Sequence, residues 1–256
     1  MSDPIHIISL GAGVQSSTMA LMAAAGEIMP MPQLAVFADT GDEPSEVYDW
    51  LELLKRLLPF PVRVGHYCRL SDHLFDSGHT EIPCFIKNED GSVGLGRRQC
   101  TRDWKLRVIS QQVRQHFDCT RRRLPDGFFT QWIGISLDEV SRAKDSREGH
   151  TKHRFPLLEK RLTRFDCVRW LESRGHRPPK SACVYCPYRG PKQWRDSKAK
   201  GGAEWDLIRT VSAKLAARGE FLTAHCLPID EVDFSTEEER GQINLFNNEC
   251  EGMCGV

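Results

Sequence analysis

The sequence lacks three features that would each define a class of protein. No apolar run is long enough to span a bilayer, and the first four residues have neither a basic leader nor an apolar stretch, so no membrane segment or signal peptide is expected. Ten cysteines in 256 residues are too sparse for a disulfide scaffold, and a chain of this length can bury a core without one. A cytoplasmic location is the resulting expectation.

Net charge is also absent, because 35 Lys and Arg residues balance 35 Asp and Glu residues. No global attraction to nucleic acid or to a membrane follows from this balance. Positive charge is nevertheless concentrated locally, in Arg97, Arg98, Arg102, Lys105 and Arg107 and again in residues 121–123. A solvated basic face and a surface for an anionic ligand or nucleic acid both remain open.

Short apolar runs alternate with helical patterns along the first 150 residues. Strands are predicted at residues 5–10, 34–38, 61–64 and 128–135, with helices from residue 16 onward and across residues 47–57. This alternation predicts an α/β fold, a Rossmann-like parallel sheet with helices on both faces that binds its ligand at the carboxyl ends of the strands. Residues 1–150 are expected to form this nucleotide-binding domain. Residues 151–256 are expected to form a smaller helical lobe packed on the sheet, with helices near 166–173, 193–198 and 204–218.

A glycine-containing turn, Gly11-Ala12-Gly13-Val14-Gln15-Ser16-Ser17, separates the first strand from the first helix. It lacks the lysine of a Walker loop and the glycine spacing of a dinucleotide-binding turn. Small residues still allow backbone N–H groups to approach phosphate oxygens, and a helix N-terminus favours negative charge. The turn is therefore predicted to bind phosphate.

Two cysteines, Cys183 and Cys186, stand two residues apart beside Pro187. This spacing places two thiolates on one turn, where they can share a soft metal ion or an iron of a cluster. Three or four ligands are usually needed, and the candidates for the others are Cys100, Cys250 and Cys254. The remaining cysteines, at positions 68, 84, 119, 167 and 226, show no partner spacing and are expected to be small buried hydrophobes.

Several motifs resemble one family. The first turn resembles the pyrophosphatase loop, Ser-Gly-Gly-x-Asp-Ser, of the adenine nucleotide α-hydrolase-like (PP-loop) superfamily. Four further segments follow in family order: residues 37–41 with Glu43, Cys100-Thr101 followed by Lys105, residues 132–135 with Asp138, Glu139 and Arg142, and residues 181–188. Together they cover most of the chain, which is similar to the phosphoadenosine-phosphosulfate reductase family, including its DNA-phosphorothioation sulfurtransferase relatives.

Three departures from the family pattern favour the sulfurtransferase branch. Gln99 precedes Cys100 where cluster-bearing reductases have a double cysteine, and Gln15 replaces the aspartate of the phosphate loop. The tail, with Cys250 and Cys254, lacks the histidine of the Glu-Cys-Gly-x-His motif that carries the reductase nucleophile.

The resemblance implies a 4Fe-4S cluster, for which two ligand sets are open. In one, Cys100, Cys183 and Cys186 hold three irons, and the fourth iron is free for sulfide or capped by a tail cysteine. In the other, Cys183, Cys186, Cys250 and Cys254 form a closed site, and Cys100 is left beside the substrate as a possible sulfur carrier. A structural zinc ion held by the second set is the alternative.

The resemblance also implies a reaction in which ATP, with Mg2+, adenylates an acceptor and releases pyrophosphate, after which sulfur displaces AMP. The sulfur would come from the cluster or a cysteine persulfide, with a cysteine desulfurase as an upstream donor. A tRNA, a DNA or a small metabolite fits as the acceptor, and a homodimer is compatible with the sequence. A reductase of adenylyl sulfate or phosphoadenylyl sulfate, using Cys250 or Cys254 as nucleophile, is the second hypothesis, and a noncatalytic nucleotide-binding protein with structural zinc is the third.

The predicted site residues follow from the turn, the strand ends and the motifs. Those predicted to bind the nucleotide are Ser9, Gly11, Ala12, Gly13, Val14, Gln15, Ser16, Ser17, Asp39, Thr40 and Gly134. Those predicted to be catalytic are Cys100, Cys254, Lys105, Asp138 and Arg142. Lys105 and Arg142, together with Arg98, are predicted to bind phosphate or the acceptor.

Overall fold

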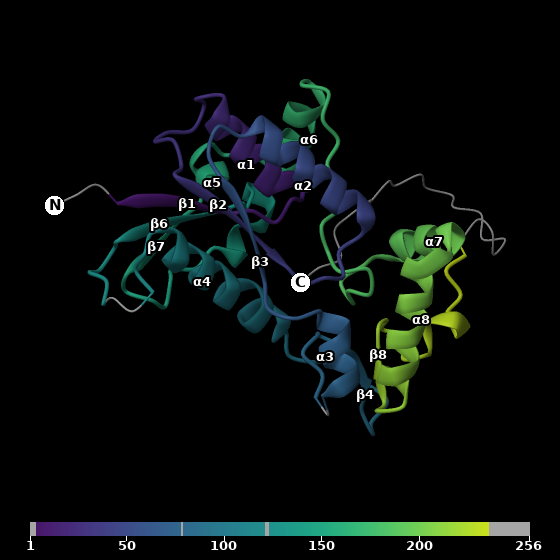
Figure 1. The fold of residues 1–256 in the computed structure, drawn as a ribbon. Helices are drawn as coiled ribbons and strands as arrows, with labels where there is room; N and C mark the ends of the chain where they lie inside the picture. Colours follow the sequence, from purple (N-terminus) through teal and green to yellow (C-terminus); the bar gives the residue numbers. More distant parts are fainter. Residues whose placement is uncertain (1–3, 78, 121–122, 236–256) are drawn as a thin grey trace. The chain divides into compact units, whose positions relative to one another are not determined.

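A computed structural model describes residues 4–77, 79–120 and 123–235 (Figure 1). The chain divides into two compact units, each built from two stretches of sequence. We call them the sheet unit, Met1–Leu70 with Cys100–Ser181, and the cysteine unit, Ser71–Gln99 with Ala182–Val256. This division differs from the boundary expected at residue 150. A strand at residues 151–154 belongs to the main sheet, and residues 71–99 belong to the other unit.

The sheet unit contains five parallel strands in the order β3-β2-β1-β6-β7. The strands are β1 (Ile5–Ser9), β2 (Leu34–Asp39), β3 (Val62–His66), β6 (Phe129–Ile133) and β7 (Thr151–Arg154). The central strand β1 pairs with β2 on one side and with β6 on the other. The order therefore reverses between β1 and β6, which is where open α/β sheets bind ligands.

Apolar side chains of the strands alternate between two buried faces. Ile8 and Phe37 pack with helices α1 (Val14–Ala24), α2 (Ser45–Leu57) and α6 (Arg164–Glu172) on one face. Ile7 and Val36 pack with α4 (Arg107–His116) on the other. Figure 1 shows these helices on opposite sides of the sheet, and the expected Rossmann-like α/β fold is confirmed.

The helices of the sheet unit follow local signals in the sequence. On α2, Val47, Trp50, Leu51 and Leu54 are spaced to form one buried stripe. Helix α6 begins at Thr163 with a capping box, and the short α5 (Pro156–Glu159) begins with proline at its first position.

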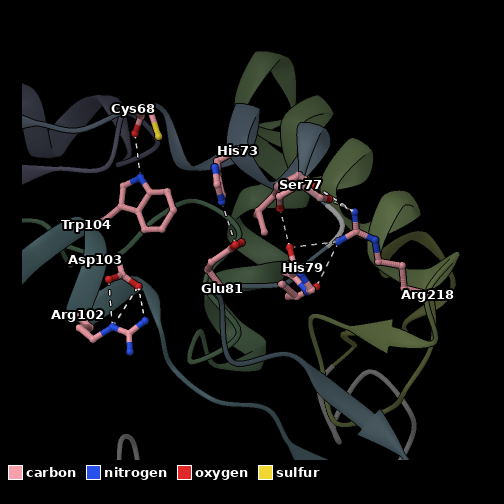
Figure 2. Close-up of polar contacts among 11 residues, drawn as sticks. Cys68, His73, Ser77, His79, Glu81, Arg102, Asp103, Trp104 and Arg218 are labelled. Atoms are coloured by element: carbon pink, nitrogen blue, oxygen red, sulfur yellow. Dashed lines mark hydrogen bonds and ion pairs between the residues drawn. The ribbon is translucent and has the colours of Figure 1, made fainter.

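A π-helix at Thr101–Leu106 precedes α4 without a break. Its buried Trp104 donates its indole N–H to the carbonyl oxygen of Cys68 over 2.9 Å (Figure 2). Cys68 is only half-buried, unlike Cys84, Cys119, Cys167 and Cys226, which are buried as expected. The eight cysteines within the described residues form no disulfide.

The cysteine unit combines helices with a small antiparallel sheet. It contains α3 (Leu70–Asp76, from its second residue), α7 (Pro191–Lys200), α8 (Gly202–Ala216), the 3-10 turn Ile229–Glu231 and a sheet of order β5-β4-β8. The strands are β4 (Phe85–Lys87), β5 (Val93–Leu95) and β8 (Glu220–Phe221). The sequence predicted α7 and α8 but not these strands. No helix within the described ranges is long and apolar enough to cross a membrane.

Candidate nucleotide site and cysteine turn

The turn after β1 leads directly into the N-terminus of α1. Ala12 is buried with a positive φ of 55°, and Gly13 caps the helix in an extended conformation without any side-chain cap. The hydroxyl of Ser16 accepts a hydrogen bond from the N–H of Gly11 (3.1 Å) and donates one to the carbonyl of Gly13 (3.3 Å). Ser16 thus closes the turn, and the first N–H groups of α1, which have no partner within the helix, are left for an anion.

Ser17 does not face the anion position. Its side chain is fully buried, its hydroxyl accepts the indole N–H of Trp50 (2.8 Å), and its own N–H donates to Gly13 within the helix (2.9 Å). The phosphate contact expected of Ser17 is therefore not available, because its polar groups join α1 to α2 in the core.

Gly134 lies against the turn from the end of β6. A Cβ atom at this position would come within 2.9 Å of both the Cα and the N atom of Ser16, closer than real Cβ contacts. Nearby, the side-chain amide of Gln131 donates to the hydroxyl of Ser9 over 2.5 Å, which joins β6 to β1 beside the turn. The absence of a side chain at Gly134 is what allows the two strand ends to enclose the turn.

Gln15 stands at the second position of α1 and connects three segments. Its amide NH2 donates to Glu139 Oε2 (2.9 Å) and to Ser136 Oγ (3.3 Å). Its amide oxygen accepts a hydrogen bond from the guanidinium of Arg164 (3.0 Å). The residue that departs from the family motif is therefore fixed by residues about 120 and 150 positions later in the chain.

The predicted catalytic residues Asp138 and Arg142 lie on the 3-10 segment Leu137–Arg142. Burial acts to raise the pKa of Asp138, but hydrogen bonds from Ser136 and from the backbone N–H of Arg164 outweigh it and lower the pKa below its ordinary value. Arg142 forms an ion pair with Glu139 at 2.5 Å. The positive charge of Arg142, predicted to bind phosphate or the acceptor, is thus paired with a carboxylate.

The end of β2 carries Asp39 and Thr40, as predicted for the nucleotide side of the sheet. Asp39 Oδ1 accepts hydrogen bonds from the N–H of Gly41 (2.7 Å) and from the hydroxyl of Tyr48 (2.8 Å). Burial and then the hydrogen bond to Asp39 raise the pKa of Tyr48 above its ordinary range. Thr40 is fully buried, and its carbonyl oxygen accepts the N–H of Leu70 (2.9 Å).

A buried carboxylate, Glu43, lies just beyond this strand end. One of its oxygens is 3.8 Å from the ammonium of Lys105, and the other accepts a hydrogen bond from the hydroxyl of Ser181 (3.3 Å). Burial raises the pKa of Glu43, although Lys105 and Ser181 oppose the shift. Ser181 also lies over Gly13, whose Cβ would be 3.5 Å from that of Ser181. The predicted residue Lys105 is thereby placed on the same side of the sheet as the turn.

The cysteine unit contains the predicted turn of Cys183 and Cys186. The N–H of Cys186 donates to the carbonyl of Cys183 (2.9 Å), so both residues lie on one reverse turn, with Cys183 buried and Cys186 half-buried. Arg189 stabilises this turn by donating to the carbonyl of Val184 over 2.7 Å. In the same unit, the guanidinium of Arg98, predicted to bind phosphate or the acceptor, stacks on the exposed ring of Tyr188 at 5.2 Å.

The described residues do not complete a metal site. Among them, no three or more His, Cys, Asp or Glu side chains are arranged to hold a metal ion. Cys100 belongs to the sheet unit, where it caps the π-helix, while Cys250 and Cys254 lie outside the described residues. Two thiols on a turn are fewer than the four ligands of a closed thiolate site, so a cluster or a zinc ion would need ligands beyond Cys183 and Cys186.

Sequence reasoning missed Arg164, whereas Glu43 and Glu139 were noted as parts of the family segments without an assigned ligand role. Arg164 carried the clearest signal, because it directly follows the helix cap Thr163, at the end of α6 where a positive charge is unfavourable.

Comparison with known proteins gives similarity in fold. No protein-family profile matches the sequence, and no curated protein does. A phosphoadenylyl-sulfate (PAPS) reductase from Candida auris, solved as a phosphate complex, is similar with a TM-score of 0.45 and 10% identity over 70% of this chain and 76% of its own. The U34-tRNA thiolase NcsA from Methanococcus maripaludis, solved with its [4Fe-4S] cluster, is similar with a TM-score of 0.42 and 13% identity over 91% of this chain and 74% of its own.

The class that the structure itself defines is an α/β protein with a Rossmann-like parallel sheet and a bare helix N-terminus at its switch point. At these levels of agreement, neither match assigns a substrate, a cofactor or a residue role to this chain.

Proposed function

We propose that this protein is an ATP-dependent sulfurtransferase, which adenylates an acceptor, releases pyrophosphate and then transfers sulfur to it. The observation that carries the nucleotide half of the proposal is the uncapped N-terminus of α1, enclosed by Gly134 at the switch point between β1 and β6. The sulfur half rests on the sequence resemblance and on the turn of Cys183 and Cys186.

The residues of the sheet unit account for the first step. The N–H groups at the start of α1 bind the phosphates, and Lys105 supplies a positive charge beside them. An oxygen of the acceptor attacks the α-phosphorus, the bond to pyrophosphate breaks, and these donors stabilise the charge that develops. A Mg2+ ion, when bound, would supply further charge stabilisation at the phosphates. A sulfur nucleophile then displaces AMP from the acceptor.

A 4Fe-4S cluster, if bound, would supply a site for sulfide or for sulfur transfer. Cys183 and Cys186 are the ligands within the described residues that we assign to it, and Cys100, Cys250 and Cys254 are the candidates for the remainder. Zinc in place of the cluster would make the cysteine turn purely structural.

The decisive experiment uses the full chain prepared without oxygen and measures two products. With ATP, Mg2+ and bulk tRNA or duplex DNA as acceptor, we expect pyrophosphate release that depends on the acceptor. With adenylyl sulfate and a thiol reductant, we expect no sulfite. Sulfite at an enzymatic rate would instead establish the reductase hypothesis.

Metal analysis of the same material tests the cluster. Iron and acid-labile sulfide should be present and should disappear in Cys183→Ala. Stoichiometric zinc without iron would contradict the cluster.

A further inference from the structure

Arg164 occupies a position that its own helix disfavours. It is the first residue of α6, after the cap Thr163, where the helix dipole repels positive charge and favours acidic residues such as Asp166. Its side chain is exposed, so packing does not account for the choice of arginine. An arginine at this point is better explained by a contact that lies outside α6.

The side chain of Arg164 is directed to the phosphate turn by a neutral partner. Its guanidinium donates to the amide oxygen of Gln15, the second residue of α1, over 3.0 Å. Within the described residues, the guanidinium forms no ion pair within 4 Å. Asp138 lies near enough for its pKa to respond to this charge, but its carboxylate is bonded to Ser136 and to the backbone N–H of Arg164.

The neighbouring arginine shows the opposite arrangement. Arg142 pairs with Glu139 at 2.5 Å, and the other oxygen of Glu139 accepts the amide NH2 of Gln15. The amide of Gln15 therefore separates an ion pair, Glu139 with Arg142, from Arg164, whose guanidinium donates to a neutral amide oxygen. An aspartate or glutamate at position 15 would instead form a salt bridge with Arg164 and neutralise it.

We propose that Arg164 is a further nucleotide-binding residue, whose guanidinium contacts the phosphates held at the N-terminus of α1, and that Gln15 positions it there while leaving its charge available. The inference rests on the proposed function, because it needs a nucleotide at this turn. It also gives a reason for the glutamine that replaces the aspartate of the family motif. Phosphate oxygens suit a guanidinium, which can donate two parallel hydrogen bonds.

Calorimetry with three ligands tests the proposal. Arg164→Gln keeps a hydrogen-bonding side chain beside Gln15 but removes the charge, and should weaken the binding of ATP and of inorganic pyrophosphate about tenfold, the effect of one charged hydrogen bond. Adenosine affinity should stay unchanged, since adenosine has no phosphate. Arg164→Lys, which keeps the charge, should fall between wild type and Arg164→Gln.

Arg169→Gln is the matched control, because Arg169 is an exposed arginine of the same helix and the change in net charge is identical. Its ATP affinity should stay within about twofold of wild type, as for other exposed charges. Thermal unfolding of every variant would separate a binding defect from a folding defect. Gln15→Met should make the effects of Arg164→Gln smaller than in the wild-type background, because the two residues are then uncoupled.

Two results would overturn the inference. If wild type binds ATP but Arg164→Gln binds it as Arg169→Gln does, or loses adenosine affinity to the same extent, Arg164 does not contact phosphate and the proposed function stands. If wild type binds neither ATP nor pyrophosphate, the proposed nucleotide site itself fails and the role of Arg164 fails with it.

Discussion

The surroundings of Glu43 disfavour the ionised form of its carboxyl group. Its side chain is only 1% exposed, and burial raises its pKa, an effect to which the nearby Asp39 and Asp42 add. Lys105 and Ser181 compensate in part, yet the pKa of Glu43 remains raised above its ordinary value of 4.5. A carboxylate kept in such a place at the carboxyl end of a strand indicates a site in which stability is given up for function.

Glu43→Gln should therefore change the pH dependence of stability. Below pH 4.5 the carboxyl group is protonated in both the folded and the unfolded chain, and the substitution should have little effect. As the pH rises through the raised pKa, the wild type loses stability because the unfolded chain ionises more readily, whereas the variant does not. Urea unfolding at several pH values should show a variant that is more stable than wild type at neutral pH.

Glu52→Gln serves as the control, because Glu52 lies on α2 with its side chain 64% exposed. Its stability should follow that of wild type at every pH. Equal pH profiles for wild type and Glu43→Gln would show that the buried carboxyl group does not carry an unfavourable charge.

At the residue scale, the sequence showed that Gln15 differs from the family motif, but it did not show that Gln15 contacts Glu139 and Arg164. Local spacing places Gln15 at a helix start, whereas Glu139 and Arg164 reach it only after the sheet has brought distant segments together. For Ser17, the position in the loop predicted a phosphate ligand, but in the structure its hydroxyl accepts a hydrogen bond from the indole of Trp50 in the core. Side-chain direction within a turn depends on tertiary packing that spacing does not record.

At the element scale, the end of β6 depends on Gly134. Gly134→Ala should push the turn away from β6, because its Cβ would meet backbone atoms of Ser16 that have no flexible way to move. We expect a loss of about 1–3 kcal/mol in stability, typical of overpacking, together with weakened ATP binding. Chemical denaturation and calorimetry would measure the two effects.

Gly94→Ala is the comparison for this variant. A Cβ at Gly94 would make only ordinary contacts, at 3.6 Å or more, with Asn88 and Ile86. Stability should change little there. If Gly134→Ala were as stable as wild type, the turn would be able to accommodate a Cβ atom at this position, contrary to the 2.9 Å distances to Ser16.

Elements were predictable where hydrophobic pattern alone defines them. Four of the five parallel strands and the helices α1, α2, α6, α7 and α8 were predicted from apolar runs and helical spacing. Strand β7 was missed because its sequence, Thr-Lys-His-Arg, is polar, as an edge strand can be. Strands β4, β5 and β8 are two or three residues long, which is too short for any alternation to appear.

At the scale of the molecule, the cysteine unit is held together by residues far apart in sequence. Arg218 donates to the carbonyl oxygens of Ser77 (2.6 Å) and His79 (3.4 Å), as Figure 2 shows. Thr80 donates to Glu220, and β4 pairs with β8. The segment 71–99 is thus part of the cysteine unit only through its contacts with the C-terminal stretch.

Arg218→Ala should destabilise the cysteine unit alone. Loss of a guanidinium that bonds backbone carbonyls should cost about 1–3 kcal/mol. Hydrogen exchange should accelerate in residues 71–99 and 202–221, while β1, β2 and β6 keep their protection. Arg209→Ala, which removes an exposed pair with Asp230, should leave exchange nearly unchanged. Uniform acceleration across both units would contradict their independence.

The division of the cysteine unit into two stretches also has a consequence for synthesis on the ribosome. Strand β4 ends at Lys87 and its partner β8 begins at Glu220, about 130 residues later. At about 5–20 residues per second, β4 emerges roughly 7–26 s before the strand it must pair with. During that interval one edge of the β4–β5 hairpin lacks its native neighbour, and its backbone N–H and C=O groups are open to pairing with another strand.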